Sequence, residues 1–218
     1  MRVSKRQLKR VIREEKNKLI AETRLRRTVR RVIREGAGYD PTDPDFLAAK
    51  DPNTPVDVLL RIASNKSPDS KWARKEVARN PNASLEVLEE LSGDETEHQN
   101  EMLGYYIAKH PNTTPELLQQ LASSESIVTR NAVAQIPLTP VAALKQLAND
   151  SNEDVRVGLA SNPSATGDIL RRLATDQVKY VRIQVAKNPS TPTDTLETLT
   201  GDTVATVRNR AKKNLKSR

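Results

Sequence analysis

The chain of 218 residues contains no cysteine. This absence excludes disulfides, cysteine-ligated zinc, iron–sulfur clusters and cysteine nucleophiles. Aromatic residues are also scarce, at 3% of the chain, whereas a thick globular core usually takes much of its bulk from Phe, Tyr and Trp. Leucine, valine, isoleucine and alanine must therefore do nearly all of the burying, which favours thin layers of small helices.

The sequence also lacks the motifs of common enzyme classes. His98 and His110 are the only histidines, and neither has a serine or cysteine partner in a recognisable catalytic motif. The chain has only seven glycines, and none of them belongs to a glycine-rich phosphate-binding loop. We therefore expect a protein without enzymatic activity, and without a bound cofactor or metal ion.

Long apolar runs are missing as well. No stretch is apolar and long enough to be a secretory signal or a membrane-spanning helix. Nothing in the composition points to an oxidising compartment. A soluble cytoplasmic protein is the expectation from these absences.

Positive charge is concentrated at one end of the chain, although the net charge is +8 overall. Residues 1–35 hold 14 Lys and Arg against 4 Asp and Glu, whereas the remaining residues hold 22 against 24. Apolar residues recur at helical spacing within residues 1–35, which predicts a basic arm of one or two amphipathic helices. We expect residues 36–45, which contain two glycines and two prolines, to link this arm to a folded region over 46–218.

Six prolines set a regular frame over the folded region. The intervals between their sequence numbers are 29, 30, 26, 26 and 26, a periodicity typical of solenoids. A leucine lies at the seventh position after each proline, and isoleucine or leucine lies at the tenth. These offsets share one helical face, which predicts a buried stripe. The six prolines are Pro52, Pro81, Pro111, Pro137, Pro163 and Pro189.

Each unit of this frame is predicted to contain two short helices. Thr54, Thr139 and Thr191 each precede a proline, which predicts a threonine N-cap for the first helix. The second helix is expected to end at the Asn-Pro corner of the next unit, because proline disfavours helical geometry in the residue before it. A single unit cannot bury both faces, so the sequence predicts an all-α solenoid of six to seven two-helix repeats of about 26–30 residues each.

Two segments show the repeated pattern most clearly, namely VAKNPSTPTDTLETLTGD and LASNPSATGDILRRLATD. This pattern resembles that of the leucine-rich-repeat variant family, and its aspartate with the following Val-Arg also resembles HEAT repeats. The resemblance covers roughly residues 43–218 and implies a right-handed superhelix of short helices that binds other macromolecules. The founding type of the family carries a cysteine-ligated iron–sulfur cluster, which this cysteine-free chain does not share.

Arginine and aspartate recur at fixed places in the repeat. One interpretation is a row of arginines for phosphates, and the other is a ladder of Arg–Asp pairs that fixes the register of stacked repeats. We favour the second, because residues that recur in every repeat usually serve the repeat itself. The predicted ladder comprises Arg74, Arg130, Arg156, Arg182, Arg208, Asp150, Asp176 and Asp202.

The basic arm has four competing interpretations. It caps the first repeat, docks on an acidic protein, binds nucleic acid through its phosphates, or lies on an anionic membrane. A protein partner is favoured and nucleic acid is the alternative, while a membrane is disfavoured because the arm has no Trp or Phe anchors. The candidate binding residues are Arg2, Lys5, Arg6, Lys9, Arg10, Arg13, Arg24, Arg26, Arg27, Arg30, Arg31 and Arg34.

The opening residues MRVSKRQLKRVIREEK resemble the N-termini of many tailed-phage proteins, where such a segment serves as a head-targeting sequence. This resemblance implies a virion or head-assembly component as a further alternative, located in the virion. It also implies proteolytic cleavage after an Ile/Leu-x-Glu pattern. The segment Ile33-Arg34-Glu35 fits this pattern, so Glu35 is the candidate processing site.

Overall fold

The computed structural model describes residues 15–16, 18, 40–93 and 102–218. Every regular element within these residues is helical, which confirms the all-α class. The even-numbered helices are α2 (Pro44–Lys50), α4 (Lys71–Val77), α6 (Leu103–Lys109), α8 (Ile127–Gln135), α10 (Glu153–Ser161), α12 (Lys179–Lys187) and α14 (Ala205–Lys216). The odd-numbered helices are α3 (Val56–Ala63), α5 (Leu85–Ser92), α7 (Pro115–Leu121), α9 (Val141–Leu147), α11 (Gly167–Leu173) and α13 (Thr193–Leu199).

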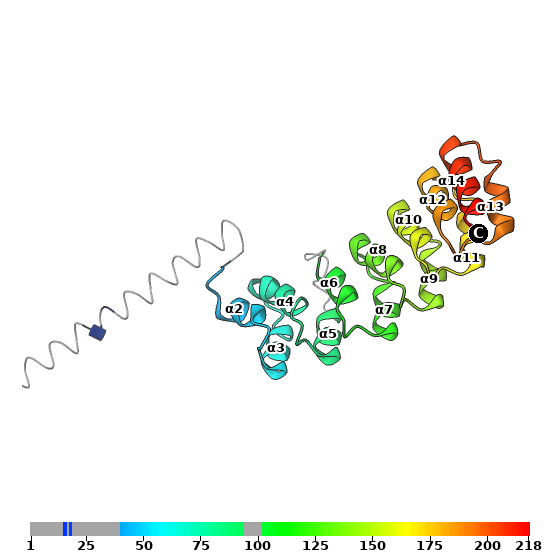
Figure 1. The fold of residues 1–218 in the computed structure, drawn as a ribbon. Helices are drawn as coiled ribbons and strands as arrows, with labels where there is room; N and C mark the ends of the chain where they lie inside the picture. Colours follow the sequence, from blue (N-terminus) through cyan, green and yellow to red (C-terminus); the bar gives the residue numbers. More distant parts are fainter. Residues whose placement is uncertain (1–14, 17, 19–39, 94–101) are drawn as a thin grey trace, which may run out of the picture.

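The helices follow one another in a repeat-like arrangement. Each even-numbered helix from α2 to α12 packs against the next even-numbered helix in chain order. Figure 1 shows an elongated, curved stack, with the even-numbered helices along one side and the odd-numbered helices along the other. Each layer is therefore covered mainly by the layers before and after it, and most contacts join neighbouring units.

The predicted leucine stripe forms the core of this stack. The leucines at the seventh position after each proline are 0% exposed, which confirms their predicted burial. Burying a leucine side chain contributes about 2 kcal/mol relative to leaving it exposed, so a short helix gains most of its stability from this face. These six residues are Leu59, Leu88, Leu118, Leu144, Leu170 and Leu196.

The threonines predicted to cap the odd-numbered helices have a different role. The prediction is wrong for Thr54, Thr139 and Thr191, because the proline after each occupies the N-cap position instead. Each threonine is buried and donates its hydroxyl to a carbonyl of the preceding helix, at 2.6–2.7 Å. Those carbonyls lie in the last turn of that helix, and each also accepts a hydrogen bond from the N–H of the C-cap residue at 3.1 Å.

The first described helix of the stack begins slightly before the predicted boundary at residue 46. The Asp43 side chain caps α2 by accepting hydrogen bonds from the Asp45 and Phe46 N–H groups, at 2.8 and 3.0 Å. Pro44 occupies the first helical position, where its missing N–H costs nothing. None of the helices in the described part of the chain is both long and apolar enough to cross a membrane.

Candidate macromolecule-binding surface

Arginine and aspartate from successive units form three bidentate pairs. In each pair the arginine Nε lies 2.6–2.7 Å from one carboxylate oxygen, and Nη2 lies 3.1–3.2 Å from the other. The sequence separation within each pair is always 20, so each pair joins an even-numbered helix to the aspartate that precedes the next one. The pairs are Arg130–Asp150, Arg156–Asp176 and Arg182–Asp202.

Main-chain contacts connect these pairs into one continuous ladder. Arg156 Nη1 donates to the main-chain oxygen of Asp150 at 2.7 Å, while the Asp150 carboxylate accepts from Arg130. Arg182 makes the same contact with the Asp176 oxygen at 2.7 Å. One aspartate therefore holds two arginines, the first through its side chain and the second through its backbone.

The ladder carboxylates titrate below their ordinary range. Burial raises the pKa of Asp176, but the hydrogen bonds from Arg156 and from the Val178 N–H together hold the pKa below its usual value. The hydrogen bond from Arg182 is the main cause of the lowered pKa of Asp202. The pairs are thus ionised and mutually satisfied at neutral pH. This geometry favours the structural interpretation of the ladder over phosphate binding.

The outer arginines of the predicted ladder are Arg74 and Arg208. Arg74 is 3% exposed within α4, and Asp94, the aspartate at the equivalent place in its unit, lies outside the described residues. Arg208 donates through Nη1 to the Asp202 and Thr203 main-chain oxygens, at 2.8 and 2.9 Å. In the described part of the chain, Arg208 forms no ion pair with a carboxylate. The three bidentate pairs described above link successive units from α8 to the segment before α14.

An open cavity of about 450 Å³ lies beside the ladder. Asp150, Arg156 and Asp176 line it, and all three belong to the pairs described above. Arg172 also lines it and donates through Nε to the Ala148 oxygen at 3.4 Å. The described residues also contain no group of three or more His, Asp or Glu side chains arranged to hold a metal ion. We therefore assign no ligand to this cavity.

A second ladder, made of asparagines, was not predicted. The Asn188 side chain is buried and donates through Nδ2 to the Ala160 and Asn162 oxygens of the preceding unit, at 2.8 and 2.9 Å. The same two-bond contact recurs at two other corners and once inside α14, where Leu215 replaces the corner proline. The asparagine before the corner proline does interrupt helical geometry, yet its amide also fastens each unit to the one before. The equivalent residues are Asn80, Asn162 and Asn214.

His110 replaces asparagine at one of these corners. Its Nε2 lies 2.9 Å from the Asn80 oxygen, and its Nδ1 accepts a hydrogen bond from the Asn112 N–H at 3.1 Å. The ring is 7% exposed and bridges the same two units as an asparagine would. This contact agrees with the sequence-based interpretation of His110 as a corner residue.

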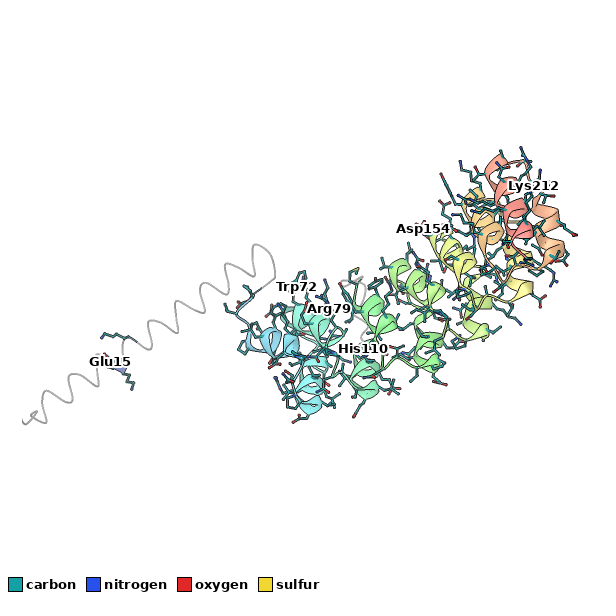
Figure 2. All side chains as sticks on the ribbon, in the orientation of Figure 1. Glu15, Trp72, Arg79, His110, Asp154 and Lys212 are labelled. Atoms are coloured by element: carbon teal, nitrogen blue, oxygen red, sulfur yellow. The ribbon has the colours of Figure 1, made fainter. Side chains whose placement is uncertain are left out.

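A cluster of cations and aromatic rings lies on the even-numbered side of the stack, across α4 and α6. Lys75 Nζ lies 5.2 Å from the centre of the Trp72 ring and 5.7 Å from that of Tyr106, so it bridges the two helices. Figure 2 labels Trp72 and Arg79, which belong to this α4–α6 cluster. The cluster comprises Lys71, Trp72, Lys75, Arg79, Tyr105, Tyr106 and Lys109.

The α4–α6 cluster combines apolar surface with net positive charge. Its three rings are half-buried, and Tyr105 and Tyr106 contact edge to face with centres 5.4 Å apart. Arg79 lies over the Tyr106 ring and also pairs with Glu76 at 3.0 Å. Lys75 and Lys109 rest on ring faces, a position from which an ammonium can also attract an anionic ligand. Aromatic rings and cations in one place are typical of binding hot spots.

The arm predictions fall almost wholly outside the described residues. All twelve candidate binding residues of the arm and the candidate processing site Glu35 lie there, as do residues 36–39 of the predicted linker. Within the arm, Glu15, Lys16 and Lys18 are helical, and Lys18 Nζ lies 2.8 Å from Glu15 Oε1. The nucleic-acid, protein and virion interpretations of the arm therefore stay predictions.

Comparisons with known proteins provide no relative. No protein-family model matches the chain, and neither the curated proteins nor the solved structures contain a significant match.

Proposed function

We propose that this chain is a right-handed α-solenoid of the leucine-rich-repeat variant type that serves as a non-enzymatic scaffold for an acidic protein. The repeat-like stack of helices supports the solenoid, since each unit buries its leucines against its neighbours. The α4–α6 cluster carries the proposal, because it is a surface on which apolar rings and cations meet. It would act as the anchor of the interface.

The chemistry of the cluster favours a protein segment with both carboxylates and aliphatic side chains. Carboxylates would pair with Lys75 and Lys109, while leucine or a similar residue would cover the half-buried ring of Trp72. Truncating a Trp, Tyr or Arg at the centre of an interface commonly costs about 2 kcal/mol or more. A short segment could therefore gain useful affinity from this small area.

Trp72 provides a direct test, because it is the only tryptophan in the chain. A short peptide in which Glu and Leu alternate should shift or quench the emission of Trp72 in a saturable titration of the full chain. A peptide in which Lys and Leu alternate has the same apolar content, and it should leave the emission unchanged. An equal response to both peptides would contradict the proposal, because the charge of the ligand would then be irrelevant.

Charge reversal within the cluster tests the residue assignment. Lys75→Glu should weaken the binding of the Glu-Leu peptide at least about tenfold, since it replaces an attraction with a repulsion in the centre of the patch. Lys179→Glu is the matched control, because Lys179 also rests on a tyrosine, Tyr180, at 5.1 Å on an even-numbered helix. Equal losses in the two variants would reject the cluster as the anchor.

Nucleic acid is the second candidate, and the excess of 14 Lys and Arg over 4 Asp and Glu in residues 1–35 favours it. Binding to duplex DNA through this arm should weaken steeply with salt, because each neutralised phosphate releases counterions. Deleting residues 1–35 should remove that binding and leave the Trp72 response to the Glu-Leu peptide intact. DNA binding that does not respond to salt would eliminate this candidate.

A further inference from the structure

A small basic pocket lies between α12 and α14, far along the stack from the α4–α6 cluster. Its volume is about 270 Å³, and its lining includes three cations, Lys187, Arg210 and Lys213. Ala186, Pro189, Asn214 and Ser217 form the rest of its lining, and no carboxylate from the described part of the chain lines it. Lys187 is the last residue of α12, Arg210 lies in the middle of α14, and Lys213 lies in the last turn of α14.

The three cations form no ion pair among the described residues, whereas three of the ladder arginines are each paired with an aspartate. Residues 205–218 contain six Lys and Arg and no acidic residue. A cation near a helix C-terminus is favourable, which accounts for Lys187 and Lys213 without a ligand. The position of Arg210, in the middle of α14, has no such explanation.

The polar walls of the pocket are already satisfied within the protein. Asn214 donates through Nδ2 to the Ala186 and Asn188 oxygens, at 3.1 and 2.9 Å. The Ser217 hydroxyl donates to the Asn214 oxygen at 2.8 Å. Arg218 lies beside the pocket and donates to the Pro189 oxygen at 3.1 Å. The free bonding capacity of the pocket therefore consists of cationic donors, which suit an anion.

We propose that this pocket binds a backbone phosphate of a nucleic acid. The fork of Arg210 suits phosphate geometry, and the two lysines add point charges. No aromatic side chain lines the pocket, so it has no surface on which a base could stack. The exposed Lys212 and Lys216 of α14 do not line the pocket, but they add positive charge next to it, and this longer-range attraction favours a polyanion over a single small ion. This site is separate from the α4–α6 cluster, and none of its lining residues belongs to residues 1–35.

The packing of the repeat does not require the pocket cations. Lys187 and Lys213 occupy the same position in successive units, and the two preceding units place the uncharged Gln135 and Ser161 there. Three units near the start of the stack also have a cation at this position, but each of those cations rests on an aromatic ring, which the pocket lacks. These cations are Lys50, Arg79 and Lys109.

Paired substitutions on α14 test the proposal in the full chain. Arg210→Gln with Lys213→Gln removes two cations from the pocket, and Lys212→Gln with Lys216→Gln removes two exposed cations that do not line it. In a titration with short duplex DNA at about 0.1 M salt, the pocket variant should lose about tenfold in affinity for each phosphate contact removed. The slope of the logarithm of its binding constant against the logarithm of the salt concentration should become less negative by about one to two. The control variant should lose clearly less.

Lysine protection gives a second readout that binding by residues 1–35 cannot mimic. With duplex DNA bound, Lys187 and Lys213 should resist acetylation relative to Lys212 and Lys216, as measured by mass spectrometry. Polyglutamate is the second probe, and it should protect the pocket lysines poorly. Equal protection by polyglutamate would show a site for acidic protein and overturn the proposal. Equal losses in the two double variants, or no selective protection by DNA, would also overturn it.

Discussion

Arg156 lies with its Nε 2.7 Å from Asp176 of the next unit, and its Nη1 reaches back to the oxygen of Asp150 in its own unit. A single guanidinium thus spans two layers of the stack. Both members of the Arg156–Asp176 pair are largely buried, with side chains 11% and 9% exposed. Removing one member therefore leaves its partner without the contact that its burial requires.

Asp176→Asn should destabilise the chain by about 2–3 kcal/mol, because the buried Arg156 loses its counter-charge. Urea unfolding followed by circular dichroism measures this difference. Asp168→Asn is the matched control, since Asp168 also pairs with an arginine, Arg171, but its side chain is 85% exposed. That exposed pair should contribute less than about 1 kcal/mol. Similar costs for the two substitutions would contradict a structural role for the ladder.

The ladder should also make stability depend on pH in the acid range. The pKa values of Asp150, Asp176 and Asp202 are lower in the folded protein than their ordinary values. A lowered pKa adds stability that is complete above the unfolded value of about 3.9 and is lost as pH falls toward the folded value. The urea concentration at the midpoint of unfolding, measured at a series of pH values from 7 to 3, should therefore begin to decrease once the pH is below about 5.

A variant with all three aspartates changed to asparagine separates this effect from other carboxylates. Its midpoint should start lower at pH 7 and fall less on acidification, because the titrating groups are gone. A triple variant whose acid dependence matches that of the original chain would rule out the ladder as the source.

The sequence predicts this ladder well because both members recur at one spacing. In three successive units an arginine is followed by an aspartate at the same separation. This regular spacing is visible in the sequence and indicates that the two residues pair. Asn188 recurs just as regularly, yet its role was not predicted. The pair Asn188-Pro189 already explains where α12 ends, and nothing in the sequence shows that the amide reaches the previous corner. Every residue has a main-chain carbonyl, so the sequence cannot indicate which carbonyl oxygen accepts the hydrogen bond.

Asn188→Ala should cost about 2–3 kcal/mol, since two buried carbonyls lose the side-chain amide that donates to them. Asn188→Asp should cost more, because a carboxylate would face those two carbonyl oxygens without a hydrogen to donate. Asn209→Ala, an exposed position on α14, should remain within about 0.5 kcal/mol of the original chain. Thermal and urea unfolding measure all three. An unaffected Asn188→Ala variant would remove the asparagine ladder from the account of stability.

His110 allows a test of whether histidine and asparagine have the same role at the corners of the repeat. His110→Asn restores the residue found at most other corners, so it should stay within about 1 kcal/mol of the original stability. His110→Ala loses both ring contacts and should cost about 2 kcal/mol. The comparison is made by urea unfolding at neutral pH. Equal costs for the two substitutions would mean that the histidine ring has a role that asparagine cannot replace.

The α4–α6 cluster shows where prediction from the sequence ends. Most units have no aromatic residue at these repeat positions: Trp72 shares its position only with Tyr180, and Tyr105 shares its position only with Phe46. The repeat pattern therefore gives the three rings little weight. Tyr106 and Lys75 belong to different units, and only the stacking of α6 on α4 brings the ring centre and the ammonium within 5.7 Å. Residues that serve packing are repeated and therefore visible in the sequence. Residues that serve binding are particular to one unit, and the fold is needed to find them.

Because the Arg–Asp pairs are equally spaced, each repeat unit between them should be interchangeable with the next. Removing residues 157–182 would place Asp202 where Asp176 stood relative to Arg156, and the asparagine corners would meet in the same register. Such a shortened chain should fold, whereas a deletion that is not a whole period would misalign both ladders at once. The length of this protein can therefore be changed, by evolution or by design, only by adding or removing whole repeat units.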